Sequence, residues 1–208
     1  MTFFERVRQR YELITADPQL VDPTDFNFRD KKHNQEKYLS FKTKEKTLVH
    51  SFSPEVNLYK SSEHFVLLDD AEQQILYFVQ FKLRSIFGHK FVAQIKLWGN
   101  PVALEKYKID GQSIGYYVFF EHLIKLAEGI GIATDSMQTP DGRRFWERCI
   151  YRAFNNKFHV YFINQNTKDR QEAVDYADFE KKSTKLAIWN AEISGMGNRV
   201  IISPKKLW

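Results

Sequence analysis

The sequence predicts a mixed α+β fold in which an antiparallel meander is followed by helix, strand, helix and strand. Apolar and polar residues alternate through most of residues 64–98, which is typical of strands with one buried face. From Tyr116 the apolar spacing changes to three and four residues, which is typical of helices. Short apolar runs follow each helical segment, and a strand–helix–strand passage after a meander indicates a mixed sheet.

Composition favours one compact domain with elaborations at both ends. The chain has 208 residues, of which 43% are hydrophobic and 15% aromatic, enough to bury a core. We expect an N-terminal elaboration over 1–62, a central core over 63–165, and a C-terminal helix and hairpin over 166–208.

Charge and cysteine content limit the function classes. The net charge of +5 is compatible with a nucleic acid, an acidic protein or a phosphate-bearing ligand. The single cysteine, Cys149, excludes an intramolecular disulfide and a cysteine-based zinc site. Because no apolar run resembles a signal peptide or reaches the roughly 20 residues that span a bilayer, we expect a cytoplasmic protein with no membrane partner.

The first 62 residues carry weaker signals. Thr2 and Glu5 fit a capping box that opens an amphipathic helix over 3–15. Asp17-Pro18 ends this helix, and strand-like pieces follow at 38–41 and 48–52.

The middle of the chain has the clearest pattern. "HFVLL", "QQILYFVQFKLRSIF" and "KFVAQIKLW" predict three antiparallel strands joined by short turns. A helix then runs from Tyr116 to about Ala127, and "IGIAT" is a short strand. A second helix starts near Asp141 and buries Trp146, Cys149 and Ile150, and "KFHVYFI" is the next strand. The tail predicts a short helix over 173–180 and two strands that flank 195–198.

This order of elements resembles the GNAT superfamily of N-acetyltransferases over about half of the chain, residues 63–165. The motif Gln112-Ser113-Ile114-Gly115 matches the first half of that family's Gln/Arg-x-x-Gly-x-Gly/Ala loop, although Tyr117 stands where a small residue is expected. The resemblance implies that the residues of this loop, together with Tyr116, bind the pyrophosphate of acetyl-CoA at a helix N-terminus. An ordinary turn before a helix explains Gly115 equally well.

The second part of the resemblance is Thr139-x-x-Gly142-x-x-x-Trp146. It is similar to the family's Asn-x-x-Ala-x-x-x-Tyr, which implies that Thr139, Gly142 and the adjacent Arg143 contact the acetyl-CoA arm. Trp146 replaces the tyrosine that protonates the departing thiolate, and an indole N–H cannot serve as that acid. Its apolar stripe instead favours a role in the core. The surrounding pattern is also similar to acetyltransferase-like proteins of bacteriophages, several of which have no established activity.

Three residues are candidates for acid–base catalysis. Asp135 or Glu147 would deprotonate the amine, and Tyr151 would replace the missing acid. The alternatives are a capping carboxylate for Asp135 and a solvated helix face for Glu147 and Tyr151.

A basic strip accompanies them on the second helix. Arg143, Arg144, Arg148 and Arg152 recur at helical spacing and could hold the 3′-phosphate of CoA or a nucleic-acid backbone. A solvated face paired with carboxylates is the alternative.

Two functions follow as hypotheses. The first is an acetyl-CoA-dependent N-acyltransferase that acts on a small-molecule or protein amine. The second is a catalytically inactive GNAT-like module that binds a protein or nucleic acid. The six dispersed histidines show no metal-binding spacing, so we expect no metal site.

Overall fold

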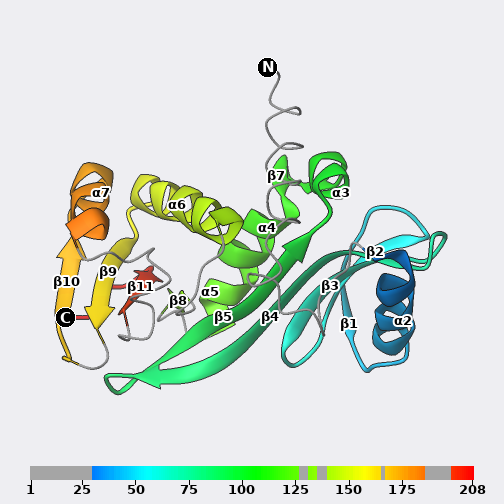
Figure 1. Ribbon diagram of the computed structural model, residues 1–208, viewed down its shortest axis with the longest axis horizontal. Coiled ribbons are helices and arrows are strands. Elements are labelled where there is room, and N and C mark those ends of the chain that lie inside the picture. The colour runs from blue at the N-terminus through cyan, green and yellow to red at the C-terminus, as the bar shows by residue number, and fades with distance from the viewer. Residues whose placement is uncertain (1–29, 127–130, 135–139, 165–166, 186–197) are drawn as a thin grey trace.

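The computed structural model describes residues 30–126, 131–134, 140–164, 167–185 and 198–208. Within these residues, nine strands form one sheet in the order β1-β2-β3-β4-β5-β8-β11-β9-β10 (Figure 1). The mixed α+β class predicted from the sequence is confirmed.

The predicted meander is confirmed and is preceded by two further strands, the first of which confirms the strand-like piece expected at 48–52. Its strands are β1 (Thr47–Ser51), β2 (Val56–Lys60), β3 (His64–Asp69), β4 (Gln74–Ile86) and β5 (His89–Gly99). Gly88 in the β4–β5 turn has a φ of +83°, which glycine adopts without strain. Register shifts where Gln80 pairs with Lys96 and Phe81 pairs with Gln94, so β5 has a bulge at Ile95.

The prediction of a strand at 38–41 is wrong, because these residues belong to helix α2 (Lys31–Lys42). The Asp30 side chain caps this helix by accepting a hydrogen bond from the His33 N–H at 2.7 Å. Tyr38 and Phe41, three residues apart, pack on the sheet with Val66 and Phe78. Three-residue spacing is helical, but two apolar positions are too few to distinguish a helix from a strand.

An insertion separates the meander from the first predicted helix. It consists of α3 (Pro101–Lys106) and a separate hairpin of β6 (Lys108–Ile109) and β7 (Gln112–Ser113). The helix then begins at Ile114, two residues earlier than expected. It comprises α4 (Ile114–Tyr117), the π-helix η1 (Val118–Leu123) and α5 (Ile124–Leu126).

The second half of the chain completes the sheet. Its elements are β8 (Ile132–Ala133), α6 (Pro140–Asn155), β9 (His159–Asn164), β10 (Arg170–Ala173), α7 (Tyr176–Lys185) and β11 (Asn198–Ser203). The predictions of β8, α6 and β9 are confirmed. The C-terminal helix starts three residues later than expected, and β10 was not expected.

Two expectations lie partly or wholly outside the described residues. The helix over 3–15 is one, and the first strand of the C-terminal hairpin is the other. The second strand of that hairpin is β11, which lies between β8 and β9 in the sheet.

The two faces of the sheet are covered by different elements. Phe65 and Leu67 of β3 join the largest buried cluster, which includes side chains of η1, α6 and α7. Val66 and Leu68, which point the opposite way, join the cluster under α2. α2 therefore covers one face at the meander end, and η1 and α6 cover the other face.

Candidate functional site

The first candidate site is the junction of β5 and β8, the parallel pair in the described part of the sheet. These strands pair only at Val92–Ile132 and Ala93–Ala133, and β5 then continues to Gly99. Beyond Ala93 the β8-facing edge of β5 has no strand partner among the described residues. An open strand edge presents main-chain donors and acceptors to an extended ligand.

Hydrogen bonds at the end of β8 connect it to β11. The Thr134 N–H donates to the Val200 carbonyl at 2.9 Å, and the Val200 N–H donates to Thr134 Oγ1 at 3.0 Å. Arg199 Nη1 donates to the Thr134 carbonyl at 2.9 Å. These bonds lie on the β11 side of β8, as expected for alternate residues of a central strand, and the β5–β8 ladder has no further pair among the described residues.

Gly115, in the loop that runs from Gln112 to Tyr117, lies where α4 packs against α6. A Cβ at Gly115 would lie 3.2 Å from Phe145 Cε2. The Tyr116 ring stacks on the same phenylalanine, with 5.8 Å between centroids and 16° between planes. Helix packing therefore accounts for the glycine. Sequence reasoning missed Phe145, because contact between residues 30 positions apart leaves no local signal.

The other residues of this loop lie at the same contact between α4 and α6. Gln112 Oε1 accepts a hydrogen bond from Arg152 Nη2 at 2.7 Å. Ser113 is the N-cap of α4 without a side-chain capping bond, and Ile114 is fully buried. The loop residues are thus brought together, with the Gln112 side chain committed to α6.

Trp146 has the core role that its apolar stripe predicted. It is fully buried and meets Phe119 edge-on at 5.1 Å between centroids. Its indole Nε1 has no hydrogen-bond acceptor among the described residues. Cys149 lies on the same stripe, and burial raises the pKa of its thiol, which does not favour a nucleophilic role.

The two candidate catalytic residues in the described part of the chain, Glu147 and Tyr151, lie on α6 and not in the β5–β8 ladder. Asp135 and Thr139 lie outside the described residues. Glu147 Oε1 accepts a hydrogen bond from Arg143 Nε at 2.7 Å, and this ion pair lies on the outer face of α6. Tyr151 is 56% exposed on the same face. Gly142, in the first turn of α6, is half-buried.

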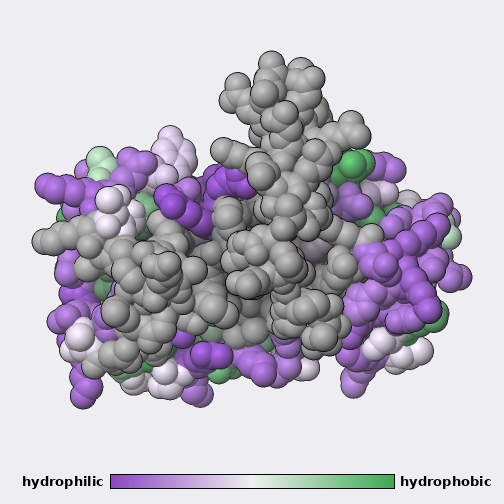
Figure 2. Space-filling model, in the orientation of Figure 1, coloured by the Kyte–Doolittle hydropathy of each residue, from purple (hydrophilic) through white to green (hydrophobic). Residues whose placement is uncertain are grey.

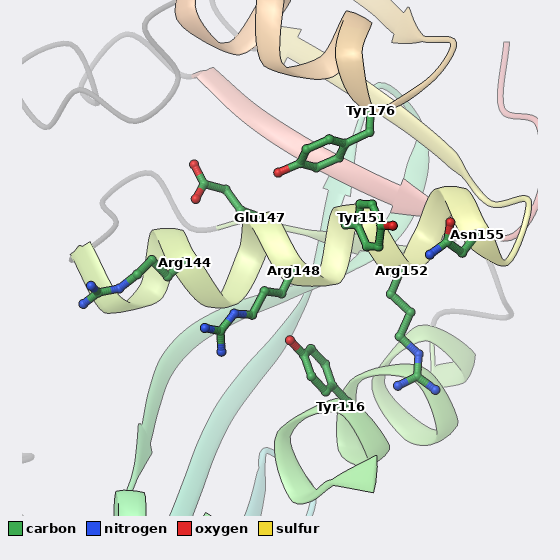
Figure 3. Close-up of a pocket in the computed structure, with 8 residues that line it drawn as sticks. All are labelled: Tyr116, Arg144, Glu147, Arg148, Tyr151, Arg152, Asn155 and Tyr176. Atoms are coloured by element: carbon green, nitrogen blue, oxygen red, sulfur yellow. The ribbon is translucent and has the colours of Figure 1, made fainter. Parts of the chain in front are cut away.

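The outer face of α6 forms a second candidate site. A solvent-open hollow of about 600 Å³ is lined by residues from α4, α6 and α7 (Figure 3). They are Tyr116, Arg144, Glu147, Arg148, Tyr151, Arg152, Asn155 and Tyr176. Three of the four arginines in the predicted strip therefore line one hollow. Tyr176 comes from a distant helix, and no sequence signal connected it with α6.

Other site classes find no support in the described residues. These residues contain no group of three or more His, Cys, Asp or Glu side chains placed to hold a metal ion. No described helix combines the length and apolar character needed to cross a membrane.

Comparisons with protein-family models, with curated proteins and with solved structures find no match to this chain.

Proposed function

We propose that the chain binds an acyl-CoA thioester, such as acetyl-CoA, along the edge of β5 beyond its short ladder with β8, and transfers the acyl group to an amine. The observation that supports this proposal is the parallel pair that ends after Ala93 while β5 continues to Gly99. The pantetheine arm of CoA is an extended chain with two amide groups. Such a chain can hydrogen-bond to an open strand edge as an added strand does.

The proposed reaction is direct transfer. The amine nitrogen attacks the thioester carbonyl carbon, the C–S bond breaks, and the proton lost by the amine appears on the sulfur of free CoA. Glu147 is ion-paired and Tyr151 faces solvent. Orientation of the two reactants is therefore the main catalytic contribution that we assign to the protein.

A second candidate is a catalytically inactive GNAT-like binding module. The observation that favours it is the Phe145 ring 3.2 Å from the Cβ position of Gly115. This ring gives the glycine a packing role that requires no phosphate. The calorimetric titration described in the next paragraph separates the two candidates.

Calorimetric titration with acetyl-CoA and with free CoA tests the proposal. We expect dissociation constants for both between roughly 1 µM and 1 mM, the usual range of substrate affinity. Hydrogen exchange should then slow in residues 94–99 of β5 on addition of acetyl-CoA, with β3 as the internal control. Absence of heat for both ligands would exclude the transferase and leave the binding module.

A further inference from the structure

The outer face of α6 carries cationic side chains in register. Arg144, Arg148 and Arg152 follow one another at every fourth residue, so neighbours are separated by about 6 Å along the helix axis. All three line the hollow between α4 and α7 (Figure 3). In Figure 2, hydrophilic surface lies over α6. A row of charges at this spacing can follow a phosphate backbone.

Two of these arginines are not paired with a carboxylate of the described chain. Arg152 donates to the neutral amide oxygen of Gln112, and its guanidinium lies 5.7 Å from the Tyr116 ring centroid. Arg148 is exposed, and neither Arg148 nor Arg152 pairs with a carboxylate of the described chain. Glu147 is the carboxylate within the hollow, and Arg143 offsets its charge at 2.7 Å. The face is therefore positive.

Tyrosine rings border the arginines on both sides. Tyr151 is 56% exposed and meets Tyr176 edge-on, with 5.3 Å between centroids. Tyr116 stands across from them on α4 (Figure 3). Burial raises the pKa of Tyr116 and outweighs the opposing charges of Arg148 and Arg152, so the phenol remains neutral at physiological pH. Neutral aromatic rings beside guanidinium groups are the usual platform for unpaired bases.

We propose that this arginine–tyrosine face binds single-stranded nucleic acid, with phosphates on Arg148 and Arg152 and a base stacked on Tyr151. Base-paired nucleic acid would satisfy the arginines but offers the rings no base faces, because these are stacked within the helix. An acidic peptide would likewise leave the exposed rings without a stacking partner. The surface is separate from the β5–β8 junction, so the inference is independent of acyl transfer.

Fluorescence polarisation with labelled (dT)20 and (rU)20, and with a 20-base-pair duplex as comparison, tests the inference at several salt concentrations. We expect tighter binding of the single strands than of the duplex. The affinity should fall with salt, with a slope of about −0.7 for each phosphate contacted.

Matched variants assign the binding to this face. Arg148→Glu should weaken single-strand binding by about tenfold or more and reduce the salt slope. Arg84→Glu makes the same charge change at an exposed position of β4 and should have little effect. Tyr151→Ala should weaken binding by about fivefold or more without changing the salt slope, whereas Tyr151→Phe keeps the ring and should bind normally.

Three results would overturn the inference. One is equal binding of duplex and single strands. Another is an equal loss of single-strand affinity in the Arg148→Glu and Arg84→Glu variants, which would mean that the net charge of the protein alone attracts the oligonucleotide. The third is a loss of acetyl-CoA affinity in Arg148→Glu when neither oligonucleotide binds wild-type protein, which would assign the face to the nucleotide end of CoA. Circular dichroism should confirm that each variant is folded.

Discussion

At the scale of single residues, a cluster of Tyr38, Lys42 and Asp70 fastens α2 to the sheet. The Tyr38 hydroxyl donates to Asp70 Oδ1 at 2.7 Å, and Lys42 Nζ donates to Asp70 Oδ2. Burial, assisted by the Asp70 carboxylate, raises the pKa of Tyr38 from 10.0 to about 12. Burial also raises the pKa of Asp70, but hydrogen bonds from Lys42 and Tyr38 outweigh it and leave that pKa below its usual value.

These shifts predict how stability depends on pH. Because the pKa of Asp70 is lowered on folding, its stabilisation is present above an unfolded pKa of about 4 and is lost as the pH falls through the folded pKa. Because the pKa of Tyr38 is raised, its stabilisation is present below pH 10.0 and is lost as the pH rises toward about 12.

Urea unfolding of the wild-type protein and of the Asp70→Asn variant between pH 2 and 7 measures how stability depends on acidic pH. We expect the free energy of unfolding of the variant to change less with pH below about 4. Tyr38→Phe should reduce the loss of stability between pH 10.0 and about 12. Parallel acidic slopes for wild type and Asp70→Asn would contradict the prediction.

At the scale of secondary-structure elements, the two-residue strand β8 joins the meander to the second half of the sheet. Gly131, just before it, has a φ of +143°, and its carbonyl accepts the Val92 N–H of β5 at 3.1 Å. A Cβ there would lie 2.3 Å from the Ile202 carbonyl oxygen of β11. The neighbouring atom belongs to the backbone of a central strand, so it has little freedom to move.

Gly131→Ala should therefore destabilise the protein strongly. Backbone strain and the clash with β11 together predict a loss of about 2–5 kcal/mol in the free energy of unfolding. Gly88→Ala is the matched control. Gly88 also has a positive φ, of +83°, but no atom lies within 4 Å of its Cβ position. The free energy of unfolding of this control variant should fall by only about 1–2 kcal/mol. Equal losses in urea unfolding of the two variants would show that β8 and β11 separate readily.

At the scale of the whole molecule, the sequence predicts elements better than it predicts contacts. Alternation along β3 to β5 and the apolar stripe of α6 are local patterns, and both elements lie where the sequence places them. α2 was missed because its buried residues are few and one of them, Asn34, is polar. At the candidate site, the arginine strip was readable from α6 alone. The Phe145 contact with Gly115 and the approach of Tyr176 depend on tertiary packing, which leaves no pattern in either segment.

Packing across the junction also predicts that the chain unfolds as one unit. The largest buried cluster includes Leu58 of β2 and Ile202 of β11. Between them, Phe119 of η1 meets Trp146 of α6 at 5.1 Å between ring centroids. The same core contains side chains from both sides of the two-residue β5–β8 junction. Neither half of the sheet can therefore bury its apolar face alone.

Urea unfolding followed by tryptophan fluorescence and by far-ultraviolet circular dichroism should give one midpoint for both probes. Phe119→Ala should lower the free energy of unfolding by about 3–5 kcal/mol, with both probes moving together. Leu83→Ala removes a side chain that is 58% exposed. It should change stability by no more than about 0.5 kcal/mol. Two separated midpoints in wild-type protein would mean that the meander and the second half of the sheet are independent folding units, which the shared core does not permit.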